Sequence, residues 1–283
     1  MVDNNSRDQT REVVESFCRR RPSRFRYTSE PQQGKSYALN TGIRESQGEI
    51  LAFVDDDVIV APSWLQNLTA GLHGGGWAGA GGRILPAGAF ELPRWLAIGG
   101  PLGMGGILCA YFDLGDRPGE LDRAPYGANM AIRKDMFRKY GGFRTDLGPG
   151  PGSEIRNEDT EFGRRLMAAG ERFRYEPSAI VYHPPPEHRV NKEYFLRWWF
   201  DFGRAFVREW GRGPAILRVP RPYFNILKLG TIVMGERMGR WMLSLNPQKR
   251  FYNKCWVWLT AGQIREYYRL AQTDKRRRTR DVP

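Results

Sequence analysis

The chain has 283 residues, of which 41% are hydrophobic and 27% charged; this balance excludes a disordered protein and is typical of a globular one. The net charge of +13 comes from the last third, because residues 189–283 hold 21 Lys and Arg against 7 Asp and Glu. Residues 1–188 are nearly neutral, with 23 basic and 24 acidic residues. This asymmetry predicts two domains, residues 1–188 and residues 189–283, divided just after Pro184-Pro185-Pro186.

The cysteines and the absence of an apolar leader indicate the compartment. Cys18, Cys109 and Cys255 lie far apart, with neither the spacing of a metal site nor that of a disulfide framework, which favours a reducing environment. The opening MVDNNSRDQT lacks the apolar core of a signal peptide. No charge-free apolar run is long enough to span a membrane. We expect a cytoplasmic protein that is either soluble or peripheral on the inner face of the cell membrane.

Strands and helices are expected to alternate along the first domain. Val2-Asp3 reads as the end of a strand, and Ser6-Arg7-Asp8-Gln9 as a capping box that opens a helix ending near Arg20. Hydrophobic periodicity then predicts helices over 36–48, 62–72, 134–140 and 157–169, and strands over 50–54, 77–85, 126–132 and 179–183. The alternation predicts an α/β fold with a mostly parallel sheet and helices on both faces.

Three consecutive carboxylates, Asp55-Asp56-Asp57, are the most specific local feature. They follow a continuous apolar run, so we expect them at the carboxyl end of a strand, where open α/β sheets bind their ligands. Mutual repulsion of the three charges would be relieved by a divalent cation shared with phosphate oxygens. The alternative is an acidic loop that caps the helix beginning near Pro62.

Four motifs together resemble family 2 glycosyltransferases of the GT-A fold, over roughly residues 2–183. They are Asp3-Asn4-Asn5-Ser6, the stretch from Gly34-Lys35 to Gly42, the Asp triplet, and Asn157-Glu158-Asp159. The resemblance implies an inverting enzyme that moves a sugar from a nucleotide-diphosphate sugar, foremost a UDP-sugar, to a hydroxyl of a saccharide or lipid-linked acceptor. It also implies Mn²⁺ or Mg²⁺ as cofactor, and a role in polysaccharide or glycolipid synthesis.

The same resemblance assigns roles to individual residues. Asp159 matches the catalytic base, with Glu158 as the next candidate; the alternative for this pair is simple charge decoration of a helix N-terminus. Asp55 and Asp57 match metal-binding acids, and His183 would complete the metal shell unless it is an ordinary surface residue at a strand end. The donor-binding residues would be Asp3, Lys35, Asp55, Asp56 and Asn129.

One departure from the family pattern concerns the start of the chain. Members of this family usually begin with a strand of the form V-S-V-V-I-P-T-Y-N and a helix, and here neither precedes Asp3. We expect either that the recorded sequence starts late or that the chain is a nucleotide-sugar-binding remnant without turnover.

The basic C-terminal third has three interpretations. Six of the nine Trp lie there, and the charged residues of the expected helix 192–210 form one narrow stripe among aromatic residues. Aromatic and basic residues together suit an anionic membrane surface or nucleic acid; the resemblance favours the membrane, so no nucleic-acid partner is expected. The remaining alternative is that this helix packs over the catalytic domain or in a dimer.

Overall fold

The computed structural model describes residues 1–88, 91–153, 155–211 and 221–280, and the chain forms two compact units. The first unit comprises Met1–Pro86, Phe112–Ser153 and Asn157–His183, and the second comprises Ala87–Tyr111, Glu154–Arg156 and Pro184–Pro283. The change of unit at residue 184 lies close to the expected boundary. Residues 87–111 differ from that expectation, because their apolar side chains pack within the second unit.

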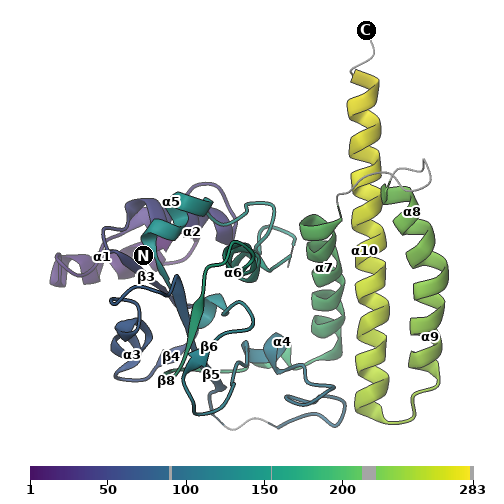
Figure 1. The fold of residues 1–283 in the computed structure, drawn as a ribbon, viewed down its shortest axis with the longest axis horizontal. Coiled ribbons are helices and arrows are strands. Elements are labelled where there is room, and N and C mark those ends of the chain that lie inside the picture. Colours follow the sequence, from purple (N-terminus) through teal and green to yellow (C-terminus); the bar gives the residue numbers. More distant parts are fainter. Residues whose placement is uncertain (89–90, 154, 212–220, 281–283) are drawn as a thin grey trace. The chain divides into compact units, whose positions relative to one another are not determined.

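A six-stranded sheet forms the centre of the first unit (Figure 1). Its strands run in the order β3 (Ile50–Phe53), β7 (Met130–Arg133), β5 (Gly79–Pro86), β8 (Phe173–His183) and β4 (Ile59–Val60), with β6 (Gly119–Glu120) also paired to β8. A separate parallel pair joins β1 (Val2–Asp3) to β2 (Thr28–Ser29).

The prediction of a mostly parallel sheet is wrong for these strands. Within the six-stranded sheet only the β5–β8 pair is parallel, among the pairings of the described residues. Strand β7 runs antiparallel to both of its neighbours, β3 and β5, and follows the short 3-10 helix η1 (Gly127–Asn129) directly. Strands β4 and β6 both pair antiparallel with β8.

Helices cover the sheet as the periodicity predicts. The first unit contains α1 (Thr10–Arg20), α2 (Lys35–Glu45), α3 (Trp64–Ala70), α5 (Lys134–Tyr140) and α6 (Glu158–Ala168). Figure 1 shows α3 on one side of the strands and α6 on the other. The expected capping box is wrong, because the backbone of Ser6 donates to Asp3 and α1 begins only at Thr10, whose N–H donates to Asp8.

Small residues and aromatic rings fill the two faces of the sheet. On one face Leu68 and Leu72 pack against Ala80, Ala131 and Ala179. On the other, the rings of Phe137 and Phe162 stack with their centroids 4.7 Å apart. Burial of these side chains fixes the ends of β3, β7 and β8, from which the candidate site is built.

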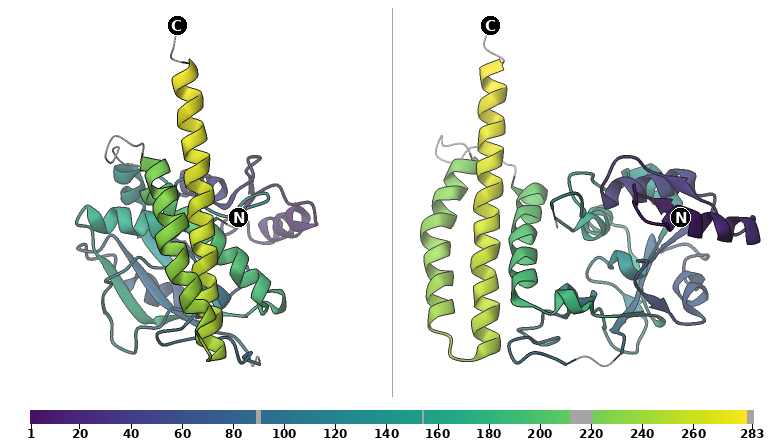
Figure 2. Two further views of the ribbon diagram at one scale, coloured as in Figure 1. Left: turned by 90° about the vertical axis from the view of Figure 1, so that its right-hand side faces the viewer. Right: turned by 180° about the vertical axis from the view of Figure 1, so that it is seen from behind.

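The second unit is helical. It contains α4 (Gly105–Cys109), η2 (Glu187–Arg189), α7 (Lys192–Trp210), α8 (Arg221–Lys228), the π-helical turn η3 (Leu229–Val233), α9 (Met234–Met242) and α10 (Pro247–Arg280). Figures 1 and 2 show α10 between α7 and the continuous α8–η3–α9 segment. Gly203 and Gly262 allow α7 and α10 to approach closely, because a Cβ at either position would lie about 2 Å from a backbone oxygen of the other helix, at 2.1 and 1.9 Å respectively.

Helix α7 has the expected bounds, but its aromatic face is covered by protein. Tyr194, Phe195 and Trp199 are buried together with Phe251 of α10 and with Leu96 from residues 87–111. The aromatic face of α7 therefore packs against α10 within the second unit, and contact of this helix with a membrane stays a prediction. Among the described residues, no helix combines the length and the apolar character that crossing a bilayer requires.

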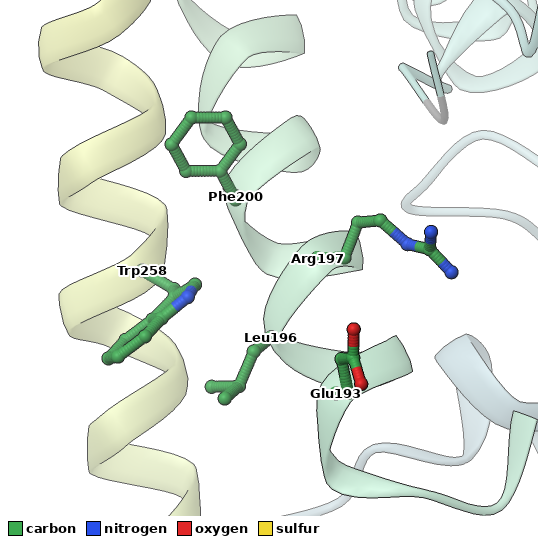
Figure 3. A pocket seen from close by; sticks show the side chains of 5 residues that line it. All are labelled: Glu193, Leu196, Arg197, Phe200 and Trp258. Carbon is green, nitrogen blue, oxygen red and sulfur yellow. The ribbon is translucent and has the colours of Figure 1, made fainter. Parts of the chain in front are cut away.

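An open pocket of about 430 Å³ lies between α7 and α10. Figure 3 shows Trp258 of α10 beside Leu196 and Phe200 of α7. Glu193 and Arg197 extend from α7 on the side away from α10. None of the residues predicted to bind donor, metal or acceptor lines this pocket.

Candidate functional site

The first component of the candidate site is a buried carboxylate at the end of β1. Asp3 is 7% exposed, and its two oxygens accept hydrogen bonds from the backbone of Ser6 at 2.9 Å and from the hydroxyl of Tyr27 at 2.8 Å. Bonds from Ser6 first, and then from Tyr27, lower the pKa of Asp3. The carboxylate is thus held ionised and oriented. Tyr27 was not predicted, since it belongs to none of the four motifs.

Asn4 connects this strand end to the glycine-lysine segment. Its side-chain oxygen accepts from the backbone of Gly34 at 2.7 Å, and its amide donates to the carbonyls of Glu30 and Gln32. Gly34 has φ of +137°, a conformation that L side chains rarely adopt. This fixed turn places Lys35 at the first position of α2.

The ammonium of Lys35 joins three motifs that are far apart in the sequence. Its Nζ lies 2.8 Å from Asp55 Oδ1 at the end of β3 and 3.7 Å from Glu158 Oε1 in the first turn of α6. Glu158 is 3% exposed, so this charge needs a nearby cation. Partial loss of hydration works against the charged form, yet the carboxylates of Glu158, Asp55 and Asp159 raise the pKa of Lys35.

Two acids and one imidazole form a group that could hold a metal ion. One ligand atom each from Asp55, Asp57 and His183 lie within 4.8 Å of one another. His183 ends β8 and is 3% exposed, with its Nε2 3.6 Å from Asp57 Oδ1. The structure thus brings together the three predicted ligands. Carboxylate and imidazole donors suit Mn²⁺ well, and Mg²⁺ with more retained water. Asp56 is exposed and lies outside this group.

Asp159 faces the loop before β7. Its Oδ2 accepts from the backbone of Gly127 at 2.6 Å, and its Oδ1 accepts from the backbone of Thr160. The preceding Asn157 has a left-handed conformation with φ of +78°, which is uncommon for a residue other than glycine. This backbone turn places Glu158 toward Lys35 while Asp159 bonds to Gly127, so the two adjacent acids have different surroundings.

The side chain of Asn129, a predicted donor-binding residue, is buried and bonded to the sheet. It is 0% exposed, its Oδ1 accepts from the indole of Trp64, and its Nδ2 donates to the carbonyls of Arg83 and Ala179. These three bonds connect η1 to α3, β5 and β8. Both polar atoms of its side chain thus form hydrogen bonds that hold these elements together. A motif comparison does not reveal such bonds.

Comparison with known proteins identifies the first half of the chain. The model of "Glycosyl transferase family 2" matches residues 1–141. This part of the chain belongs to glycosyl transferase family 2.

Two curated relatives and one solved structure extend this likeness. The succinoglycan biosynthesis protein ExoM of Rhizobium meliloti is 28% identical over 209 residues, covering 74% of this chain and 63% of that protein. A glucosyl-dolichyl phosphate glucuronosyltransferase of Haloferax volcanii is 24% identical over 192 residues, covering 64% of this chain and 58% of that protein. The match thus spans about three fifths of these relatives.

The solved structure is the mannosyltransferase PcManGT of Pyrobaculum calidifontis, in complex with GDP-Man and Mn²⁺. It superposes with a TM-score of 0.59 at 17% identity, over 95% of this chain and 77% of that one. At this identity the likeness concerns the fold, and it confirms the GT-A fold with an additional C-terminal helical segment.

Proposed function

We propose that the chain is an inverting glycosyltransferase that moves a hexosyl group from a nucleotide-diphosphate sugar to an acceptor hydroxyl. The observation that carries this proposal is the convergence on Lys35. Its ammonium contacts Asp55, at the end of β3, and Glu158, beside Asp159 on α6. Residues of the glycine-lysine segment, the Asp triplet and the Asn-Glu-Asp turn therefore form one site, as family membership requires.

The charge balance of the site supports a bound cation. The Lys35 ammonium contacts Asp55 and Glu158 and is influenced by Asp159, and Asp57 lies beside Asp55. A donor diphosphate would add further negative charge, which a site of this composition repels. Asp55, Asp57 and His183 would hold Mn²⁺ or Mg²⁺, which when bound stabilises the charge on the departing nucleoside diphosphate. Lys35 would add a fixed positive charge on the same side.

The chain's own residues supply the remaining functions. Asp3, kept ionised by Ser6 and Tyr27, would accept a hydrogen bond from the nucleotide base, with uracil as the first base to test. Asp159 would take the acceptor hydroxyl's proton as the new glycosidic bond forms and the anomeric carbon–phosphate oxygen bond breaks. Its bond to Gly127 fixes its position, which offsets the low basicity of a carboxylate.

For the acceptor we propose a saccharide carried on a lipid. The support is the Haloferax volcanii relative, whose name states that it acts on glucosyl-dolichyl phosphate. ExoM supports a role in polysaccharide synthesis, since its name places it in succinoglycan biosynthesis.

Metal-dependent donor binding tests this proposal most directly. Calorimetric titration of the protein with UDP, and in parallel with GDP, is expected to show binding with Mn²⁺ or Mg²⁺ and little with chelator. Asp57→Ala should remove the metal-dependent component and leave the melting temperature nearly unchanged, since Asp57 is 45% exposed. The matched control is Asp122→Ala, an exposed acid paired with its neighbour Arg123, which should bind as the unaltered protein does.

Turnover separates an active enzyme from a binding remnant. Asp159→Asn keeps the size of the side chain and removes its basicity, so turnover should fall about 10²–10⁴-fold while donor affinity is nearly kept. If the unaltered chain binds nucleotide with metal but hydrolyses and transfers no sugar, the remnant alternative is correct. Nucleotide affinity that is equal with and without metal contradicts the site assignment itself.

A further inference from the structure

The outer surface of the α8–η3–α9 segment is apolar although no part of the described chain covers it. Six large side chains make up this outer stripe, and all are exposed: Leu227, Ile232, Met238, Met242, Leu243 and Leu245. The last two lie in the turn before α10 and are 83% and 94% exposed. Single exposed apolar residues are ordinary, whereas several large ones on one segment mark an interaction surface.

The stripe is distinct from the face by which the segment packs in its own unit. Ile226 and Leu229 lie against the cluster of Val207, Tyr267 and Leu270. Further along, the guanidinium of Arg237 donates to the carbonyl of Trp256, which is on α10. These contacts satisfy the inner face. The six outer side chains are therefore not needed to hold the segment in place.

The π-helical turn η3 (Leu229–Val233) interrupts the α-helical register of the segment. Ile232 lies within this turn, and Met238 and Met242 are four residues apart on α9, about one helical turn. Leu243 and Leu245 lie beyond the end of α9. The exposed apolar side chains are therefore densest at the C-terminal end of the segment.

Cationic side chains lie on this segment and at the start of α10. Residues 222–254 contain six Lys and Arg and one acid, Glu236, and Glu236 pairs with Arg240 at 2.7 Å. Lys228, Lys249 and Arg250 are exposed, and within the described ranges no ion pair with an acid involves them. A stripe of apolar side chains with exposed cations beside it has the composition of an interfacial helix.

We propose that the outer stripe docks on an anionic phospholipid bilayer, with the apolar side chains among the acyl chains near the surface and the cations at the headgroups. A second copy of this chain fits less well, because a symmetric dimer places the same patch on both partners and would bring like charges together. An anionic bilayer complements both the apolar and the cationic groups. This docking surface goes beyond the proposed glycosyl transfer and does not depend on it.

Vesicle flotation of the full chain tests the proposal. The protein should float with phosphatidylcholine vesicles that contain phosphatidylglycerol, less with phosphatidylcholine alone, and less at high salt because exposed charges are screened. Leu243→Ser/Leu245→Ser should lower the vesicle–water partition coefficient on the order of 100-fold, because the apolar surface of two leucines would no longer be buried in the bilayer. Lys249→Gln/Arg250→Gln should lower it about fivefold per charge, and only with anionic vesicles.

Matched controls separate docking from general stickiness and from misfolding. Leu65→Ser changes a 52% exposed leucine on α3, outside the stripe, and should float like the unaltered protein. Leu227→Ser repeats the test at the other end of the stripe. A far-ultraviolet circular dichroism spectrum and a melting temperature like those of the unaltered chain verify that each variant is folded.

Two outcomes overturn the proposal. One is flotation of the Leu243→Ser/Leu245→Ser variant equal to that of the unaltered chain. The other is failure of the full chain to float together with a concentration-dependent dimer that the same substitutions dissociate, which would assign the stripe to self-association.

Discussion

A buried carboxylate in the second unit gives a sharp test of how the basic helices are held together. Glu266 of α10 is 0% exposed. Its oxygens lie 2.9 Å from Arg208 Nε, 3.3 Å from Arg204 Nε and 2.5 Å from Arg269 Nε. Although burial opposes its ionisation, Arg208 and Arg269 lower the pKa of Glu266. Glu266 therefore contacts three guanidinium groups where α7 and α10 meet, and Arg204 also pairs with Asp201 at 2.8 Å.

Glu266→Gln keeps the shape and removes the charge. Removing one partner of a buried ion pair costs about 3–5 kcal/mol. We reduce this to about 2–4 kcal/mol because the side chains of Arg204, Arg208 and Arg269 are 21%, 18% and 49% exposed. For a chain of this size, that corresponds to a melting temperature lower by about 4–10 °C at neutral pH. Thermal unfolding followed by circular dichroism measures the difference.

The pH dependence has a definite sign. A carboxylate whose folded pKa is depressed stabilises fully above its unfolded value, about 4.3, and loses this contribution as the pH falls through the folded value. The difference between Glu266→Gln and the unaltered chain should therefore be full at pH 7 and shrink below about pH 4. Glu236→Gln removes an exposed acid paired with Arg240, and should cost less than about 0.5 kcal/mol. A Glu266→Gln variant as stable as this control would refute the reasoning.

Three other substitutions test the two units separately. Lys35→Met removes the ammonium beside Asp55, so calorimetry should show Mn²⁺ binding about tenfold tighter and nucleotide-diphosphate binding weaker; unchanged metal affinity would contradict the proposed proximity. Asn129→Ala leaves two buried carbonyls and one indole N–H unpaired, and urea denaturation should give a free energy of unfolding lower by about 2–4 kcal/mol; a loss of donor affinity without a loss of stability would support its predicted role. Gly262→Ala places a Cβ 1.9 Å from a backbone oxygen of α7 and should cost about 3 kcal/mol, whereas Gly239→Ala, with no atom within 4 Å, should not destabilise.

Much of the first unit could be predicted because its signals are local. The apolar run before Asp55 forms β3 (Ile50–Phe53), and the periodic segment 134–140 forms α5 with those bounds. Strand direction was not predictable in the same way, because β7 and β5 read alike as apolar segments and only the path between them decides whether they run antiparallel.

The site shows the same division between local and long-range information. The sequence alone shows that the Asp triplet follows the apolar run of β3 and that His183 ends the apolar run of β8. The structure brings Asp55, Asp57 and His183 together. The bond from Tyr27 to Asp3 and the three bonds of Asn129 depend on residues 24 to 65 positions away. Motif spacing carries no information on such partners, and for this reason the bonds by which Asn129 joins the sheet were not predicted.

The second unit illustrates a limit of amphipathic patterns. Helix α7 is rich in Trp and Phe, and its amphipathic pattern correctly predicts that one face is shielded from solvent. A pattern does not specify what covers that face, and here Phe251 and Leu259 of α10 do so. The outer stripe on α8–η3–α9 is less aromatic, and the segment contains the π turn Leu229–Val233, which hydrophobic periodicity at 3.6 residues per turn does not anticipate. The aromatic face of α7 is thus packed against α10, and the surface that we propose for membrane docking belongs to a segment without a regular helical period.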